Sequence, residues 1–195
     1  MKKLLVFAAF AIAVAAMSFS LGSNYTVDVA ASNIVWTGYK VTGKHTGNVK
    51  IKSGSFITND GKITGGSFLI DMNSLTCTDL DAEYGGKLVG HLKAEDFFGV
   101  AKYPTAELVL TRVIPQDSKG NYKMVGNLTI KDVTREVKFF ANITEAAGKL
   151  TGSGKITVDR SDFNIRYGSG SFFDGLGDKT IYDDFDLNFS IVARK

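Results

Sequence analysis

The sequence contains few of the residue types that carry out covalent or metal-assisted catalysis. Its 195 residues include one cysteine, Cys77, and two histidines, His45 and His91. A thiol nucleophile needs a base within hydrogen-bonding distance, so Cys77 with His91 is the pair to consider. No Gly-x-Ser-x-Gly elbow, Walker loop or His-Glu-x-x-His zinc motif is present. We therefore expect no enzyme, no cofactor and no metal site, and keep a Cys77–His91 enzyme as the third alternative.

Large aromatic side chains stand out in a segment that is too short and interrupted for a core helix or strand. Residues 91–104, HLKAEDFFGVAKYP, place Phe97, Phe98 and Tyr103 among charges, a glycine and a proline. Each such ring buries a large apolar area when it finds cover. These rings must therefore cover something: either they plug the end of a core, or they close the mouth of a cavity.

A second segment, residues 159–181, combines aromatic rings with cations. Arg160 stands three residues before Phe163, and further rings follow. One or two polar groups at the end of an apolar cavity would suit a lipid with a polar head group. The alternative is that Arg160 forms an ion pair with a nearby acid such as Asp159 or Asp162.

Most of the remaining chain alternates apolar and polar residues with a period of two. This alternation is typical of half-buried antiparallel strands. Turn signals such as Asn59-Asp60-Gly61 separate the runs, and we count eight or nine strands. The runs are near residues 25–30, 33–42, 48–58, 62–72, 107–114, 121–131, 133–144, 149–159 and 184–193.

About eight antiparallel strands with one apolar face predict an all-β fold, a closed antiparallel β-barrel with short helical insertions. A barrel of this size is either filled by side chains or holds one small ligand. A sandwich is the second choice. A membrane barrel would need apolar residues outward, and the long insertions and the charged end Ala193-Arg194-Lys195 favour a soluble barrel.

Glycines on the expected inward face leave the state of the interior open. Gly66, Gly126, Gly152 and Gly154 stand between large apolar residues, where a solid core would use Leu or Val. They indicate either a hollow interior or positions where strands coil.

The N-terminus has the pattern of a secretory signal peptide. Residues 1–20 comprise Lys2 and Lys3, an apolar run shorter than a membrane span, and the small-residue site Ser18-Phe19-Ser20. The expected mature domain is residues 21–195, periplasmic or secreted and not membrane-spanning. Without the leader the formal charge falls from +3 to about +1. Its basic residues are scattered among acids, so we expect no nucleic-acid partner. A homodimer would cover edge strands if the barrel closes incompletely.

Three phrases in this order resemble the YceI-like family: residues 91–108 (HLKAEDFFGVAKYPTAEL), 126–144 (GNLTIKDVTREVKFFANIT) and 155–168 (KITVDRSDFNIRYG). The resemblance runs from about Tyr25 to Ala193. It implies an extended, lipocalin-like barrel that holds a polyisoprenoid, an isoprenoid quinone or a fatty amide in an apolar tunnel, and no established enzymatic activity. Residues 86–90, GKLVG, depart from the charged phrase that many members carry there. This departure bears on the identity of the head group more than on the apolar tunnel.

The predicted function is to bind and sequester or transport a long-chain amphiphilic lipid. The rival is a non-enzymatic envelope interaction or stress protein with a filled barrel, which an exposed apolar patch would favour. We predict aromatic residues in the tunnel or its mouth, and two polar residues near the head group. The predicted ligand-binding residues are Trp36, Phe97, Phe98, Tyr103, Phe163 and Phe172 for the lining, with His91 and Arg160 for the polar contacts.

Overall fold

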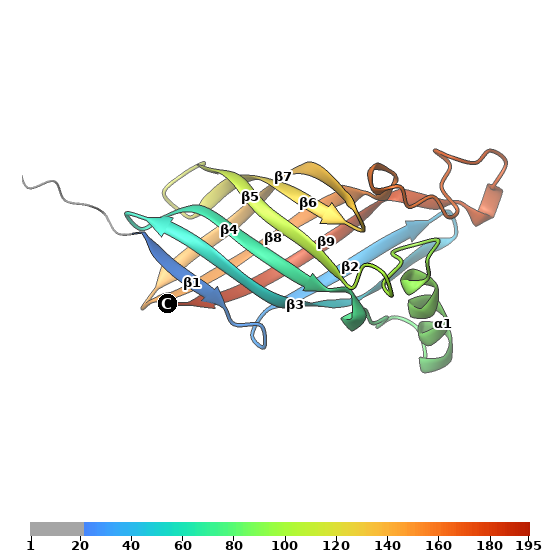
Figure 1. The fold of residues 1–195 in the computed structure, drawn as a ribbon, viewed down its shortest axis with the longest axis horizontal. Helices are drawn as coiled ribbons and strands as arrows, with labels where there is room; N and C mark the ends of the chain where they lie inside the picture. Colours follow the sequence, from blue (N-terminus) through green and yellow to red (C-terminus); the bar gives the residue numbers. More distant parts are fainter. Residues whose placement is uncertain (1–21) are drawn as a thin grey trace, which may run out of the picture.

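A computed structural model describes residues 22–195 of the chain, so the predicted leader at residues 1–20 lies outside the described part. Within residues 22–195 the chain forms nine antiparallel strands, one α-helix and three short 3-10 turns (Figure 1). The strands are β1 (Ser23–Val27), β2 (Asn33–Lys40), β3 (Gly43–Asn59), β4 (Lys62–Asp71), β5 (Thr105–Pro115), β6 (Asn121–Ile130), β7 (Val133–Ala146), β8 (Lys149–Asp159) and β9 (Ile181–Arg194). The helix is α1 (Ala82–Lys93), and the turns are η1 (Met72–Ser74), η2 (Arg160–Phe163) and η3 (Gly177–Lys179).

The strands close into a barrel of eight positions. Strands β2 to β9 form a continuous circuit, because β4 pairs with β3 and β2 pairs with both β3 and β9. The short strand β1 occupies the same place as β2 further along the barrel, where it also lies between β3 and β9. The predicted all-β, antiparallel, lipocalin-like barrel is therefore confirmed. Among the described residues, strands β2 to β9 pair on both sides, and the expected homodimer stays a prediction.

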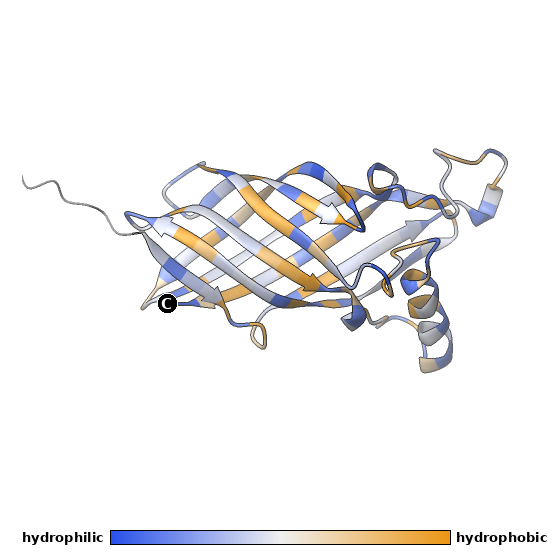
Figure 2. Ribbon diagram, in the orientation of Figure 1, coloured by the Kyte–Doolittle hydropathy of each residue, from blue (hydrophilic) through white to orange (hydrophobic). Residues whose placement is uncertain are grey.

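Hydrophobic and hydrophilic residues alternate along the strands (Figure 2). The buried apolar residues form one core cluster to which all nine strands contribute. Strand β6 is typical, since Tyr122, Met124, Leu128 and Ile130 are buried. No helix within residues 22–195 is long and apolar enough to cross a membrane.

The insertion between β4 and β5 contains the 12-residue helix α1, which agrees with the predicted short helical insertions. Asp81 caps α1 by accepting a hydrogen bond from the backbone N–H of Tyr84, 2.9 Å away. Glycines at positions 85, 86 and 90 lower the helix propensity of this stretch. The helix and the long loop before β9 both lie at one end of the barrel, and the C-terminus lies at the other (Figure 1).

The inward glycines serve close packing between strands. A Cβ at Gly66 would lie 2.6 Å from the carbonyl oxygen of Ser55, and one at Gly154 would lie 2.6 Å from the ring of Phe189. Cβ atoms at Gly126 and Gly152 would also be tightly placed against the adjacent strand. Of the two interpretations left open, strand coiling with close approach holds at these positions, and the open space lies elsewhere.

Candidate functional site

The interior of the barrel contains two apolar cavities, of about 120 and 80 Å³. The larger lies toward the end that carries α1 and the long loop, and the smaller lies deeper in the barrel. Four apolar side chains line both cavities and form the waist between them: Ile34, Ile70, Leu128 and Leu187.

Inward residues of β9 retain partial exposure although they belong to the core. Phe185, Leu187 and Phe189 pack against the buried cluster but are only half-buried, and each lines a cavity. A fully packed interior would leave no accessible surface at such positions. The barrel is therefore partly hollow along this strand.

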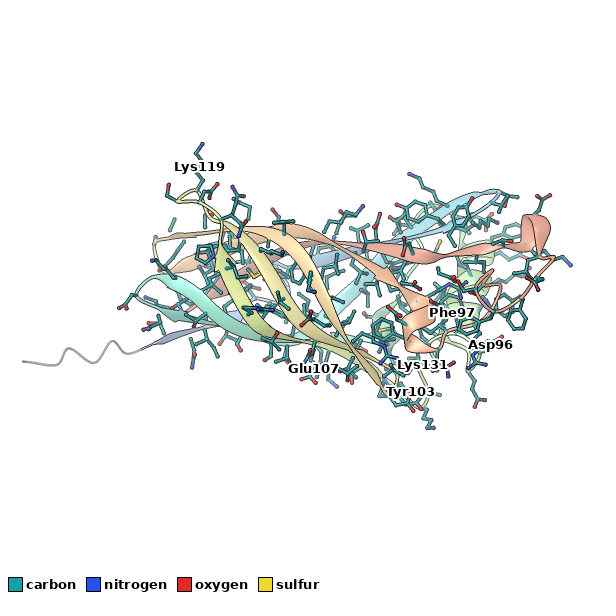
Figure 3. All side chains as sticks on the ribbon, turned by 90° about the horizontal axis from the view of Figure 1, so that it is seen from above. Asp96, Phe97, Tyr103, Glu107, Lys119 and Lys131 are labelled. Carbon is teal, nitrogen blue, oxygen red and sulfur yellow. The ribbon has the colours of Figure 1, made fainter. Side chains whose placement is uncertain are left out.

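The aromatic pair of the 91–104 segment covers the end of the larger cavity. Phe97 is buried, Phe98 is half-buried, and both line this cavity. Their rings meet edge to face with centroids 5.0 Å apart, and Phe98 also meets Phe185 at 6.3 Å. Figure 3 shows Phe97 at one end of the barrel and Lys119 at the other. The rings of this segment thus form the wall at the barrel end.

Trp36 forms part of the wall of the same cavity. Its side chain is buried on the inward face of β2, and its indole N–H donates a hydrogen bond of 3.0 Å to the carbonyl oxygen of Thr76. Gly47 lies opposite Trp36 in the sheet, and a Cβ there would lie 1.8 Å from that same carbonyl oxygen. The segment around Thr76 therefore packs directly onto the barrel wall and fixes the indole.

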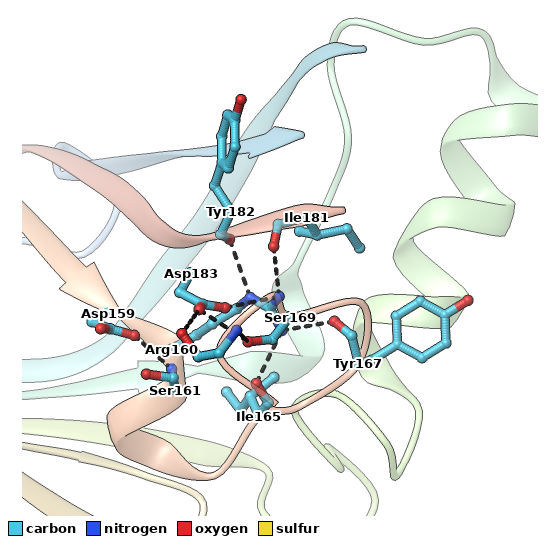
Figure 4. Close-up of polar contacts among 10 residues, drawn as sticks. Asp159, Arg160, Ser161, Ile165, Tyr167, Ser169, Ile181, Tyr182 and Asp183 are labelled. Carbon is cyan, nitrogen blue, oxygen red and sulfur yellow. Dashed lines mark hydrogen bonds and ion pairs between the residues drawn. The ribbon is translucent and has the colours of Figure 1, made fainter. Parts of the chain in front are cut away.

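Arg160 lies beneath the long loop with 2 % of its surface exposed, and it borders the larger cavity. Its guanidinium donates hydrogen bonds to four carbonyl oxygens and forms an ion pair of 3.1 Å with Asp183, not with the neighbouring acids that the sequence suggested (Figure 4). The four acceptors are the carbonyl oxygens of Ile165, Tyr167, Ile181 and Tyr182.

The hydrogen bonds to carbonyl oxygens occupy four of the five N–H donors of Arg160. Burial lowers the pKa of its guanidinium, while the charge of Asp183 opposes that effect. The hydroxyls of Ser169 and Ser171 donate to the other oxygen of Asp183, at 2.9 and 2.6 Å. The described contacts give Arg160 a structural role in fixing the long loop, and its contact with a head group stays a prediction.

His91 lies beside this cluster on α1 and does not line either cavity. Its ring meets Phe97 and Tyr167 edge to face, with centroids 5.5 and 4.3 Å away. Its Nε2 atom is buried and has no hydrogen-bond partner among the described residues. His91 is therefore close to the covering rings, and its contact with a head group stays a prediction.

Two other predicted residues, Tyr103 and Phe163, lie outside the interior cavities. Tyr103 donates a hydrogen bond of 3.1 Å to Asp132, and Phe163 is fully buried in η2. Both border a polar surface crevice of about 570 Å³, and neither lines an interior cavity. Tyr103 thus joins the outer wall at this end of the barrel (Figure 3).

Phe172 and its neighbour Phe173 are exposed on the long loop, at 39 % and 50 %. The guanidinium of Arg166 stacks over the ring of Phe172 at 4.9 Å. Phe172 lines neither cavity, so in this structure it does not close the barrel over its interior.

The surroundings of Cys77 do not support a thiol nucleophile. Its sulfur donates to a carboxylate oxygen of Asp79 at 3.2 Å, and His45 contacts the other oxygen of that carboxylate at 3.0 Å. Burial and the Asp79 hydrogen bond raise the pKa of the thiol. A reactive cysteine needs a lowered pKa, so Cys77 does not meet the condition that the enzyme hypothesis set.

Sequence reasoning missed most of the aliphatic lining. The lining residues are of the same types as any hydrophobic core. The alternation along each strand could still have identified them as residues that face the interior. The strand residues that line the larger cavity and were not predicted are Ile34, Gly38, Tyr39, Val49, Ile70, Ala106, Leu128, Ile130, Ile181, Tyr182, Phe185 and Leu187.

Solved structures with this fold come from several bacteria. BcnA of Burkholderia cenocepacia has a TM-score of 0.65 at 22 % identity, covering 85 % of this chain and 98 % of its own. A polyisoprenoid-binding domain from Saccharophagus degradans gives 0.64 at 14 % identity, covering 87 % and 97 %. The YCEI protein of Campylobacter jejuni gives 0.55 at 20 % identity, covering 100 % and 99 %.

Sequence comparison gives the family. UPF0312 proteins of Pseudomonas savastanoi pv. phaseolicola and Pseudomonas syringae pv. syringae are each 29 % identical over 111 residues. That match covers 54 % of this chain and 53 % of each relative, so the aligned region spans about half the length of these proteins. The model of the YceI-like domain matches residues 25–193. The chain therefore belongs to the YceI-like domain family.

Proposed function

We propose that this protein binds one long-chain amphiphilic molecule, an isoprenoid or fatty chain with a polar head, and sequesters or transports it in the bacterial envelope. The observation that carries the proposal is the pair of apolar cavities that follow each other inside a closed barrel. Family membership and the polyisoprenoid-binding domain among the solved structures with this fold support the same ligand class.

Affinity in such a site would come from removing the chain from water, at about 0.8 kcal/mol per CH₂ group. The walls supply aliphatic and aromatic side chains from strands on all sides of the barrel. Because four of the five donors of Arg160 bond to carbonyl oxygens and its charge is paired with Asp183, we expect the polar head to find its partners at the surface, outside the apolar interior.

The cavities are small for a complete lipid. An apolar cavity of about 150 Å³ accepts a molecule the size of benzene, whereas sites for drug-sized ligands usually measure about 300–1,000 Å³. A long chain would therefore have to move the waist residues Ile34, Ile70, Leu128 and Leu187 and join the two cavities.

A fluorescence titration tests this function. The mature protein is mixed with cis-parinaric acid, a fluorescent fatty acid, and the bound probe is then competed with decylubiquinone or geranylgeraniol. Saturable uptake of one probe per chain, with displacement by an isoprenoid, is the expected result. Absence of uptake at micromolar protein would reject the proposal.

The second candidate is an envelope interaction protein that uses its surface. The specific observation in its favour is the exposed pair Phe172 and Phe173, with the half-exposed ring of Tyr182 nearby in sequence. It predicts no uptake of the probe, together with retention of a protein partner that a Phe172→Ser, Phe173→Ser variant loses.

A further inference from the structure

The wall of the barrel is interrupted between β2 and β9. Their pairing is regular from Asn33 opposite Ser190 to Gly38 opposite Phe185, and the next pair joins Lys40 to Ile181. One residue of β2 therefore faces three residues of β9, numbers 182–184. Such a bulge bends the longer strand and leaves its extra residues outside the ladder.

Arg160 holds the extra residues of β9 away from β2. The carbonyl groups of Ile181 and Tyr182 accept hydrogen bonds from its guanidinium at 2.9 and 3.2 Å, and Asp183 forms the ion pair at 3.1 Å (Figure 4). The carbonyl group of Tyr182 is consequently not available to pair with β2, whereas Ile181 remains paired with Lys40. The buried arginine thus maintains the interruption.

The interruption borders the larger cavity on both sides. Gly38 and Tyr39 from β2 and Ile181 and Tyr182 from β9 all line it, and Tyr182 is 51 % exposed at the surface. A Cβ at Gly38 would meet no atom within 4 Å. At the bulge, therefore, two tyrosine side chains form the wall of the cavity, and one of them is exposed at the surface.

The end of the barrel beside α1 is covered by packed and hydrogen-bonded residues. Phe97 is buried there against Arg160, whose guanidinium stacks over the ring at 5.5 Å. The backbone amides of residues 97–100 donate hydrogen bonds to carbonyl groups of residues 92–94, which fixes the covering turn. Entry through the end would require these contacts to break, whereas entry through the wall would require movement of the exposed Tyr182 and of the half-buried Tyr39, whose hydroxyl donates one hydrogen bond of 2.7 Å to Asp186.

We propose that the gap between β2 and β9, bordered by Gly38, Tyr39, Ile181 and Tyr182, is the port through which the chain of the ligand enters. The inference rests on the proposed function and assigns its route. The tail passes through the wall, and the polar head stays at the surface near Lys40. This lysine forms no ion pair among the described residues. A group that blocks the port without contacting the bound chain should change the association and dissociation rate constants by the same factor. Their ratio, Kd, should then stay unchanged.

The test blocks the port reversibly. In a Cys77→Ser background, Tyr182→Cys is coupled through a disulfide to a polyethylene glycol chain, which is bulky and stays in water. Stopped-flow uptake of cis-parinaric acid is measured before coupling, after coupling and after reduction. We expect coupling to slow association and dissociation at least tenfold with little change in Kd, and reduction to restore both rates.

The matched control is Tyr84→Cys, an exposed tyrosine on α1 that lines neither cavity. Coupling at this position should leave the rates unchanged. A second variant, Tyr182→Ala, should widen the port and raise the association rate. Unchanged rates in coupled Tyr182→Cys would overturn the port while the binding function stands. Failure of the unmodified protein to take up the probe would overturn both.

Discussion

The indole N–H of Trp36 donates a hydrogen bond to the carbonyl oxygen of Thr76, 3.0 Å away, and this contact fixes the single tryptophan of the chain in the wall of the larger cavity. The position makes Trp36 a reporter for the contents of the barrel. It also gives the first prediction, because a quinone quenches tryptophan emission only when the two groups come close.

Addition of decylubiquinone should quench the emission of Trp36 with saturation at one equivalent. The emission of the free protein should already be blue-shifted, since Trp36 is buried. A steady-state titration checks both expectations. Uptake of parinaric acid without any quenching by the quinone would place the isoprenoid away from Trp36.

Gly38→Leu should fill the larger cavity. The new side chain meets no neighbour at its Cβ and points into apolar space, so it should lower the affinity for parinaric acid at least tenfold. Cavity filling commonly adds about 0.5–2 kcal/mol of stability, so urea unfolding should show no loss. Gly86→Leu is the control, because Gly86 on α1 also has open space but lines neither cavity. Equal affinity in the two variants would contradict the placement of the ligand.

Leu187→Ala should remove part of the waist and join the two cavities. Competition with saturated fatty acids of increasing length should then shift toward longer chains relative to the wild type. Truncation of a buried leucine costs about 2–5 kcal/mol, and we expect the lower end because this side chain already borders empty space. Val109→Ala on the outside of β5 controls for loss of apolar bulk. An unchanged length preference would mean that the waist does not limit the site.

Arg160→Lys should destabilise the protein although it preserves the charge. Lysine has three donors, so at least two of the five contacts of Arg160 are lost, and unpaired buried acceptors cost about 1–3 kcal/mol each. We expect faster hydrogen exchange in residues 161–183 and a lower free energy of unfolding in urea. Arg166→Lys, at an exposed site on the same loop, should change neither quantity substantially. If the two variants were equally stable, the role assigned to Arg160 would be wrong.

Asp186 on the outer face of β9 should make stability depend on pH. Burial raises the pKa of its carboxyl, but hydrogen bonds from Lys155, Thr157 and Tyr39 outweigh this effect and hold the pKa below its usual value. A lowered pKa in the folded state stabilises the protein above the unfolded value of about 3.9. That contribution is lost as the pH falls through the lower folded value. Asp186→Asn should therefore be less stable than the wild type at pH 7, and urea titrations should show the difference shrinking below about pH 4. A difference that does not change with pH would contradict the assignment.

The strands and the core could be read from the sequence because a period of two is a local property. In β6 and β9, every second residue faces the interior, so inward residues such as Leu128 and Leu187 can be identified from the alternation. The alternation does not show which inward residues pack against a neighbour and which face empty space. Gly38 and Gly154 are alike in sequence, yet one borders the cavity and the other packs on Phe189.

The two insertions were harder to interpret because loop residues have no periodicity. Phe97 and Phe98 lie against the cavity while Phe172 is exposed, although all were predicted from the same reasoning. The partner of Arg160 was also out of reach, since Asp183 lies 23 positions further along the chain and meets it only through the bulge in β9. Long-range contacts of this kind depend on register, which composition does not give.

The most direct measurement is native mass spectrometry of the mature protein purified from its own envelope, followed by solvent extraction and lipid analysis. The account predicts one amphiphilic molecule per chain, lost on denaturation and identified as an isoprenoid or fatty-chain compound. A clean apo mass, with no uptake of isoprenoid quinones or fatty amides on incubation, would contradict it and leave the barrel as a scaffold for its surface.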